Sequence, residues 1–309
     1  MKRKMPAVSL IGAGKVGSTL ATALFKQGYR ILSVVNRTGP AAVALARKVS
    51  CPRASTQIVD TDRSADLILF SVGDPDLAGA VRALAAVRGL KLKKTVVLHT
   101  SGVHDAGVLA PLGKAGASVA SFHPLQTFPE DSGGGNKSPV LRGIPFSVDG
   151  DDAAIGFARK LASDLGGRLL PIDPTLRPLY HAACVFASSY LAVVLNAISG
   201  LSASARLGGT WMENFGPLMT ASMGNMVRGG AGNTLTGPVV RGDAATVGIH
   251  LKALEKFAPE FVPLYTVCGL EVARLSLSGG RISKKDFDSI MGLFREAVRT
   301  PPARPGRKR

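Results

Sequence analysis

The chain has 309 residues, of which 46% are hydrophobic and 19% charged, so it is long and apolar enough to bury a large core. This composition excludes a mostly disordered protein. The three cysteines, Cys51, Cys184 and Cys268, match no zinc or disulfide spacing, so we expect no metal site and a reduced, cytoplasmic protein.

The formal net charge of +17 raises the question of a nucleic-acid partner. Both ends of the chain are basic, and the remaining excess is spread along the sequence. There is no helix-turn-helix pattern, zinc finger or aromatic-and-basic RNA motif. We therefore expect no nucleic-acid partner, and we attribute the charge to solvated tails and to an anionic cofactor and substrate.

Residues 1–173 alternate short apolar runs with amphipathic stretches, the pattern of parallel strands joined by crossover helices. Strands are expected at 7–11, 30–35, near 54, and at 65–72, 95–100, 117–123, 144–148 and 167–172. Helices are expected at 16–27 and 40–49 and from about 75, 104 and 151. We predict one doubly wound α/β sheet, a Rossmann domain, with a flexible glycine-rich loop at 132–137.

From about residue 174 the pattern changes to long helical stretches, at 175–206, 211–227, 244–257, 263–276 and 284–298. We predict an all-α domain over 174–298 and a disordered basic tail over 299–309. The uncharged stretch 182–205 is long enough to span a bilayer, but its Ser, Asn and Gly content favours a helix covered by protein, so we expect no membrane partner. Helices this apolar predict a homodimer.

A glycine motif, LIGAGKVG, lies between the first strand and the first helix, with Gly12, Gly14 and Gly17 in G-x-G-x-x-G spacing. The first glycine permits a tight turn, the second lets the backbone approach a pyrophosphate, and the third lets the helix pack on the sheet. We predict a bound dinucleotide whose contacts are Gly12, Ala13, Gly14, Lys15, Val16 and Gly17.

The second strand ends in Asn36, Arg37 and Thr38, where an NAD-binding domain normally has an acid for the ribose. An acid would repel a 2′-phosphate, whereas Asn36 is uncharged, Arg37 can make a bidentate phosphate contact and Thr38 offers a hydroxyl. These residues predict NADP as the cofactor. The alternative is a solvated turn after a strand.

Ligands of open α/β sheets bind at the carboxyl ends of the strands. Ser71, Val72, Gly73 and Asp74 end the fourth strand and are predicted to contact the ribose through their backbone, unless they form a plain turn. At the end of the fifth strand, His99, Thr100, Ser101 and Gly102 are predicted to contact nicotinamide or substrate. Helix capping by Thr100 or Ser101 is the alternative.

Two further histidines are candidates for proton transfer. His123 precedes a proline, which fixes it in extended backbone at the same edge of the sheet, and His181 shares a helix face with Ser188 and lies near Asn196. We predict His181 as the proton donor, because histidine titrates near neutrality, with His123 as the second choice. Structural histidines and helix-helix hydrogen bonds are the alternatives.

The remaining substrate contacts are predicted from the C-terminal motif TGPVVRGDAAT and from polar residues near the histidines. Ser101 and Asn196 would orient the substrate, and Arg241 would bind its anionic end. Asp243 is well placed as the N-cap of the next helix, which is a structural role.

The motifs GAGKVG and NRT resemble the coenzyme domains of pyrroline-5-carboxylate reductases, β-hydroxyacid dehydrogenases and deazaflavin-dependent NADP reductases. The motifs SFHPLQTF, YHAACVFASSYL and TGPVVRGDAAT resemble a bacterial family of Rossmann-like oxidoreductases whose helical C-terminal domain has no assigned function. The resemblance covers about residues 6 to 298 and implies a C-terminal domain similar to that of 6-phosphogluconate dehydrogenase, and a dimer. The family pattern has Asn where this chain has Ser189.

Taken with the motifs, this resemblance predicts an NADP-dependent oxidoreductase that transfers a hydride between NADPH and a small, anionic C=O or C=N substrate. The alternative is a catalytically idle NADP(H)-binding protein that acts as a redox sensor or scaffold.

Overall fold

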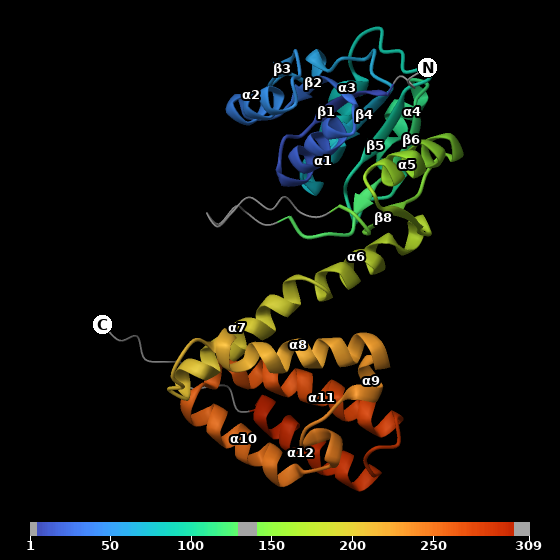
Figure 1. The fold of residues 1–309 in the computed structure, drawn as a ribbon. Helices are drawn as coiled ribbons and strands as arrows, with labels where there is room; N and C mark the ends of the chain where they lie inside the picture. Colours follow the sequence, from blue (N-terminus) through green and yellow to red (C-terminus); the bar gives the residue numbers. More distant parts are fainter. Residues whose placement is uncertain (1–4, 129–140, 300–309) are drawn as a thin grey trace. The chain divides into compact units, whose positions relative to one another are not determined.

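The computed structural model describes residues 5–128 and 141–299. The chain forms two compact units, Met1–Ser188 and Ser189–Arg309 (Figure 1). The N-terminal unit extends beyond the predicted limit at residue 173, because the short helix α6 (Arg177–Phe186) is anchored in it by a buried arginine. The glycine-rich loop predicted at 132–137 and the predicted tail from residue 300 onward lie outside the described residues.

The N-terminal unit contains a six-stranded parallel sheet in the order β3-β2-β1-β4-β5-β6, so the predicted Rossmann sheet is confirmed. Its strands are β1 (Ala7–Ile11), β2 (Arg30–Val35), β3 (Ala54–Ser55), β4 (Leu67–Phe70), β5 (Val96–His99) and β6 (Ser118–Ser121). The order reverses between β1 and β4, which is the switch point where ligands of such sheets bind.

Helices cover both faces of this sheet, and its central strands are therefore buried on both sides (Figure 1). Leu67 and Leu69 of β4 pack against one face's helices, α1 (Lys15–Lys26), α2 (Gly39–Lys48) and α5 (Asp152–Asp164). The alternate residues Ile68 and Phe70 pack against α3 (Asp74–Ala85), η2 (Ala106–Leu109) and α4 (Ala110–Lys114). Period-two side-chain alternation in the strands therefore builds a three-layer α/β/α core.

The last strands of this unit form a separate, smaller sheet, in contrast to the single sheet predicted from the sequence. Its strands are β7 (His123–Pro124), β8 (Pro145–Val148) and β9 (Arg168–Pro171), with β7 antiparallel to β8 and β8 parallel to β9. Apolar alternation fixes which residues form a strand but not which strand they pair with, so the sequence pattern could not separate the two arrangements.

The C-terminal unit is helical within the described residues, as predicted. It contains α7 (Ser189–Ser204), α8 (Trp211–Gly229), α9 (Ala231–Thr234), η4 (Val239–Arg241), α10 (Ala244–Phe257), η5 (Pro259–Phe261), α11 (Val262–Ser278) and α12 (Lys284–Arg299). Its core lies among η4, α10, α11 and α12 and includes Val247, Ala273 and Phe294. The side chain of Asp243 accepts a hydrogen bond from the Thr246 N–H at 2.9 Å, which confirms the predicted N-cap of α10.

Candidate functional site

The glycine turn between β1 and α1 is tight on one side and open on the other. Gly12 has φ +105°, and a Cβ atom there would lie 2.2 Å from the Ser71 carbonyl oxygen, so only glycine fits. A Cβ at Gly17 would lie 2.1 Å from the Gly12 oxygen, whereas one at Gly14 would meet nothing within 4 Å. The space beside Gly14 at the uncapped start of α1 suits an anionic pyrophosphate.

The side chain of Asn36 joins the end of β2 to this turn. Its Oδ1 accepts the Ala13 N–H at 2.9 Å, and its Nδ2 donates to the Thr38 hydroxyl at 2.9 Å. The Ala13 N–H and the Asn36 side chain, both predicted as cofactor contacts, are therefore engaged with each other. Their observed role is to position the turn.

Arg37 lies on the surface beside α3. Its NH1 is 3.3 Å from the Asp76 Oδ2, and the two side chains are 85% and 58% exposed. Ion pairs this exposed contribute less than about 1 kcal/mol, so an incoming phosphate can displace the carboxylate. Arg37 is thus available for the predicted phosphate contact, in competition with Asp76.

A cleft of about 570 Å³ runs along the carboxyl ends of the sheet strands, within the N-terminal unit. Its walls come from the glycine turn, the ends of β4 and β5, the start of β7 and α6. The predicted residues that line it are Gly14, Lys15, Val16, Ser71, Val72, Gly73, Asp74, Thr100, Ser101, Gly102, His123 and His181. The sequence therefore predicted most of one cleft from segments that are far apart along the chain.

The rings of His123 and His181 both approach Gly102, the last residue of the stretch His99 to Gly102 that was predicted to contact nicotinamide or substrate. A Cβ at Gly102 would lie 2.5 Å from the His181 Cδ2 and 3.0 Å from the His123 Nε2. The two imidazole rings are nearly perpendicular, with centroids 6.1 Å apart. Two groups capable of proton transfer therefore share one small area of the cleft.

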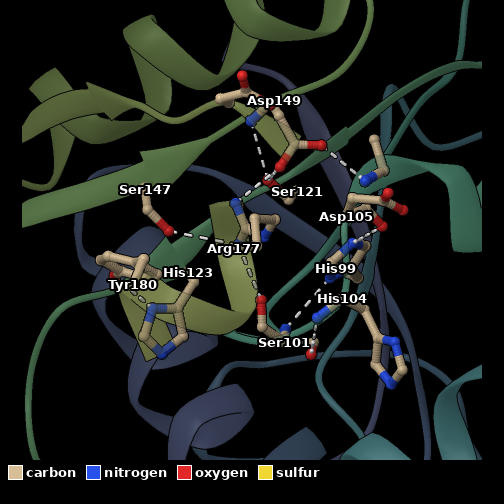
Figure 2. Close-up of polar contacts among 12 residues, drawn as sticks. His99, Ser101, His104, Asp105, Ser121, His123, Ser147, Asp149, Arg177 and Tyr180 are labelled. Carbon is tan, nitrogen blue, oxygen red and sulfur yellow. Dashed lines mark hydrogen bonds and ion pairs between the residues drawn. The ribbon is translucent and has the colours of Figure 1, made fainter. Parts of the chain in front are cut away.

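Tyr180, which was not predicted as a site residue, contacts the His123 ring on the side opposite Gly102. The Tyr180 hydroxyl lies 2.8 Å from the His123 Nδ1 (Figure 2). Burial lowers the pKa of His123 to about 4, with further lowering by the positive charges of Arg177 and His181. His123 is therefore neutral at pH 7, which suits a hydrogen-bond donor better than a proton donor.

His99 does not face the cleft, which corrects its predicted role as a cofactor contact. The ring is fully buried, with Nε2 3.0 Å from the Asp105 carbonyl oxygen and Nδ1 accepting the Ser101 N–H at 3.2 Å. Burial lowers the pKa of His99 to about 4. Both ring nitrogens are used within the protein, so His99 is a neutral structural histidine that shapes the loop after β5.

The first turn of α6 is anchored by a buried ion pair that the sequence analysis did not find. Arg177 donates from NH1 to the Asp149 Oδ2 at 2.7 Å, and the two side chains are 0% and 4% exposed (Figure 2). Asp149 also accepts from the Ser121 hydroxyl and the Ala106 N–H, each at 2.7 Å. The sequence contained one signal for a buried, paired arginine. Arg177 is the only Lys or Arg between Arg168 and Arg206, and a lone charge in an apolar stretch needs a partner.

The remaining predicted residues either make hydrogen bonds within the protein or lie outside the cleft. The Ser101 hydroxyl accepts the His104 N–H at 3.1 Å, and the Thr100 hydroxyl donates to the Ser71 hydroxyl at 3.1 Å. Asn196 on α7 and Arg241 in η4 are exposed and belong to the C-terminal unit, so neither is part of the cleft as the N-terminal unit forms it.

The fold and the cleft define an α/β protein of the Rossmann type with an added helical domain. Residues 1–124 match the Rossmann-like domain family, and residues 144–272 match a domain of unknown function, DUF2520. The chain therefore combines a Rossmann-like domain with a DUF2520 domain, and the predicted resemblance is confirmed.

Solved structures share this architecture. A candidate NADP oxidoreductase from Bacteroides fragilis is 24% identical with a TM-score of 0.72, covering 88% of this chain and 99% of that one. A reductive aminase from Aspergillus terreus, in complex with NADPH and ethyl-5-oxohexanoate, is 18% identical with a TM-score of 0.55, covering 96% and 94%. An imine reductase from Myxococcus stipitatus, in complex with NADP+, is 15% identical with a TM-score of 0.58, covering 95% and 94%. At these identities the likeness shows the fold.

Proposed function

We propose that the protein is an NADP-dependent oxidoreductase that reduces a small C=O or C=N substrate. The observation that carries this proposal is the convergence of His123 and His181 over Gly102, in a cleft that begins at a dinucleotide-type glycine turn. Relatives of the same fold are solved with NADPH or NADP+, and one of them is named a reductive aminase and another an imine reductase, which supports the C=N alternative.

The residues of the cleft, together with those at the end of β2, fit a dinucleotide. Gly14, Lys15 and Val16 would hold the pyrophosphate, Arg37 and Thr38 the 2′-phosphate, and the backbone of Ser71 to Gly73 the ribose. The chemistry that bound NADPH supplies is the donation of a hydride to the substrate carbon.

The two histidines would then have separate roles, one in binding the substrate heteroatom and one in protonating it. His123, neutral at pH 7, would donate a hydrogen bond to the substrate oxygen or nitrogen, where negative charge develops. His181, half-buried on the first turns of α6, would deliver the proton. Ser101 lines the same cleft, while Asn196 and Arg241 remain proposed contacts for the substrate and its anionic end.

An NADPH oxidation assay tests this function. Purified protein would be incubated with NADPH and a panel of imines, 2-oxo acids and 3-oxo acids, with the absorbance of NADPH followed over time. Turnover with one class identifies the substrate chemistry. Tight NADPH binding without turnover across the panel would instead favour the idle sensor or scaffold.

Cofactor selection should depend on Arg37. We expect NADPH to bind at least about tenfold tighter than NADH, a difference of about 1.4 kcal/mol and within the range of one charge-assisted contact. Arg37→Ala should remove this preference, because the 2′-phosphate loses its cation. Isothermal titration calorimetry with both nucleotides measures the effect.

Asp76→Asn is the matched variant for this experiment. It removes the carboxylate 3.3 Å from Arg37 but keeps the arginine, so it should tighten NADPH binding and leave NADH nearly unchanged. Equal affinities of the wild type for NADPH and NADH would contradict the assignment of the cofactor.

We propose a homodimer formed through the helices of the C-terminal unit. Within the described residues, α8 has no buried residue, and its Leu218 and Val227 are 63% and 78% exposed. The helical stretch Pro174–Ser204 is long and apolar enough to cross a membrane. However, its Arg177 is already buried against Asp149, so membrane insertion would break that pair, whereas a second chain can cover the apolar helices without doing so.

Light scattering without detergent should give about twice the chain mass of 32.0 kDa. Val227→Glu should shift the protein toward the monomer, because a charge cannot be buried unpaired in an apolar interface. Val59→Glu, at a residue that is 53% exposed in the N-terminal unit, is the control and should leave the mass unchanged. A wild-type monomer at micromolar concentration would contradict the dimer.

A further inference from the structure

A chain of hydrogen bonds begins at Arg177 and leads toward the cleft. The Arg177 NH2 donates to the Ser101 carbonyl oxygen at 3.1 Å and to the Ser147 hydroxyl at 3.3 Å (Figure 2). A guanidinium carries donors only, so the Ser147 oxygen must act as the acceptor in this contact. The proton of the Ser147 hydroxyl is therefore directed to a different neighbour.

The nearest side chain of this kind is Tyr180, whose pKa Ser147 lowers. Ser147 pairs with His123 across the antiparallel strands β8 and β7, and Tyr180 follows Arg177 by one helical turn, which places the Tyr180 hydroxyl close to both (Figure 2). Burial raises the pKa of Tyr180 to about 12, and a hydrogen bond from the Ser147 side chain opposes this rise, the direction expected when serine donates to the phenol oxygen. Tyr180 thus stays protonated. The Cys184 side chain is a second neighbour that raises the pKa of Tyr180, but sulfur is a weak acceptor, so the 2.8 Å contact favours donation to the His123 Nδ1.

The last link decides which nitrogen of His123 carries the proton. The Tyr180 hydroxyl lies 2.8 Å from Nδ1. If the hydroxyl donates, Nδ1 is the acceptor and a neutral ring must carry its proton on Nε2. Nε2 is the nitrogen beside Gly102, on the cleft side of the ring.

We infer that Arg177 is a positioning residue which, through Ser147 and Tyr180, fixes the neutral His123 ring as the tautomer that presents an Nε2–H to the cleft. The use of this N–H to bind the substrate oxygen or nitrogen rests on the proposed function, but the tautomer itself is a property of the free protein. Arginine cannot accept, so the Arg177–Ser147 bond runs in one direction only, and the two bonds that follow would run in the same sense.

Nitrogen NMR of the full chain tests this inference without nucleotide or substrate. The five histidines would be labelled with ¹⁵N and their ring signals recorded at pH 7.5, with His123 identified from a His123→Asn variant. We expect a protonated Nε2 and an unprotonated Nδ1 for His123. A protonated Nδ1 in the wild type would overturn the inference.

Tyr180→Phe removes the hydroxyl and should leave His123 as a mixture of both tautomers, seen as averaged shifts for its two nitrogens. Ser147→Ala should move the same signals in the same direction, and it covers the case in which Tyr180→Phe does not fold. The matched control is Tyr265→Phe, which removes a hydroxyl 2.8 Å from the His250 Nδ1 in the C-terminal unit and should change His250 alone. Unchanged His123 signals in both Tyr180→Phe and Ser147→Ala would also overturn the inference. Absence of reductase activity would count against the proposed function but not against the tautomer.

Discussion

Asp149→Asn is expected to lower the free energy of unfolding of the N-terminal unit by about 3–5 kcal/mol, the usual cost of leaving one charge of a buried pair without its partner. The change removes a negative charge but almost no volume. Arg177, whose side chain is fully buried, then faces a neutral amide. The Ser121 hydroxyl and the Ala106 N–H also lose a charged acceptor.

Hydrogen exchange of peptides from β1 and β4, followed as a function of urea, measures this loss. Fluorescence would not, because the single tryptophan, Trp211, belongs to the C-terminal unit. Asp173→Asn is the control, since Asp173 is an exposed helix cap for which asparagine is an equally good residue. A loss below about 1 kcal/mol for Asp149→Asn, as at an exposed ion pair, would refute the anchoring role.

A double variant separates the charge from the packing. Arg177→Met combined with Asp149→Asn removes both charges, so it should cost less than Asp149→Asn alone. A larger loss in the double variant would show that the arginine stabilises α6 through its hydrogen bonds to Ser101 and Ser147 rather than through the ion pair.

His181→Ala is expected to lower kcat by about 100-fold, or roughly 2.7 kcal/mol, once a substrate is known. The physical reason is the loss of the proposed proton donor over Gly102. NADPH affinity should be nearly unchanged, because the predicted cofactor contacts lie on the glycine turn and at the ends of β2, β4 and β5, whereas His181 lies on α6. His104→Ala is the control, since His104 lies two residues after Gly102 in the segment that follows β5 but does not line the cleft.

His123→Ala should also reduce kcat, and the two histidines can be told apart by their pH dependence. Removing the proton donor should abolish any fall of kcat with rising pH, whereas His123, neutral above about pH 4 because burial lowers its pKa, adds no such step at neutral pH. If His181→Ala keeps full activity and His123→Ala does not, the roles are reversed. If neither variant changes kcat, the proton comes from solvent or another residue.

The sequence predicted the Rossmann sheet because its signals are local. Buried strands such as β1 and β4 are continuous apolar runs, and the glycine turn is set by steric limits at Gly12 and Gly17 that only glycine meets. The smaller sheet was not predicted, because the antiparallel pairing of His123 with Ser147 depends on residues that are distant in the sequence.

The candidate site was predicted in outline for a related reason. Residues at the ends of parallel strands must meet at one edge, so Ser71, Thr100 and His123 could be grouped without a structure. Side-chain partners follow no such rule. His99 was assigned to the cleft although its ring turns inward, and Tyr180 and Arg177 were passed over because their roles depend on contacts made from α6 to other elements.

The glycine beside the two imidazole rings should also constrain related sequences. Every replacement of Gly102 adds at least a Cβ atom, which would lie 2.5 Å from one ring and 3.0 Å from the other. A homologue with any other residue at this position must therefore have moved or lost one of the two histidines. Position 102 should covary with positions 123 and 181, so an alignment alone can reveal which homologues keep the paired rings.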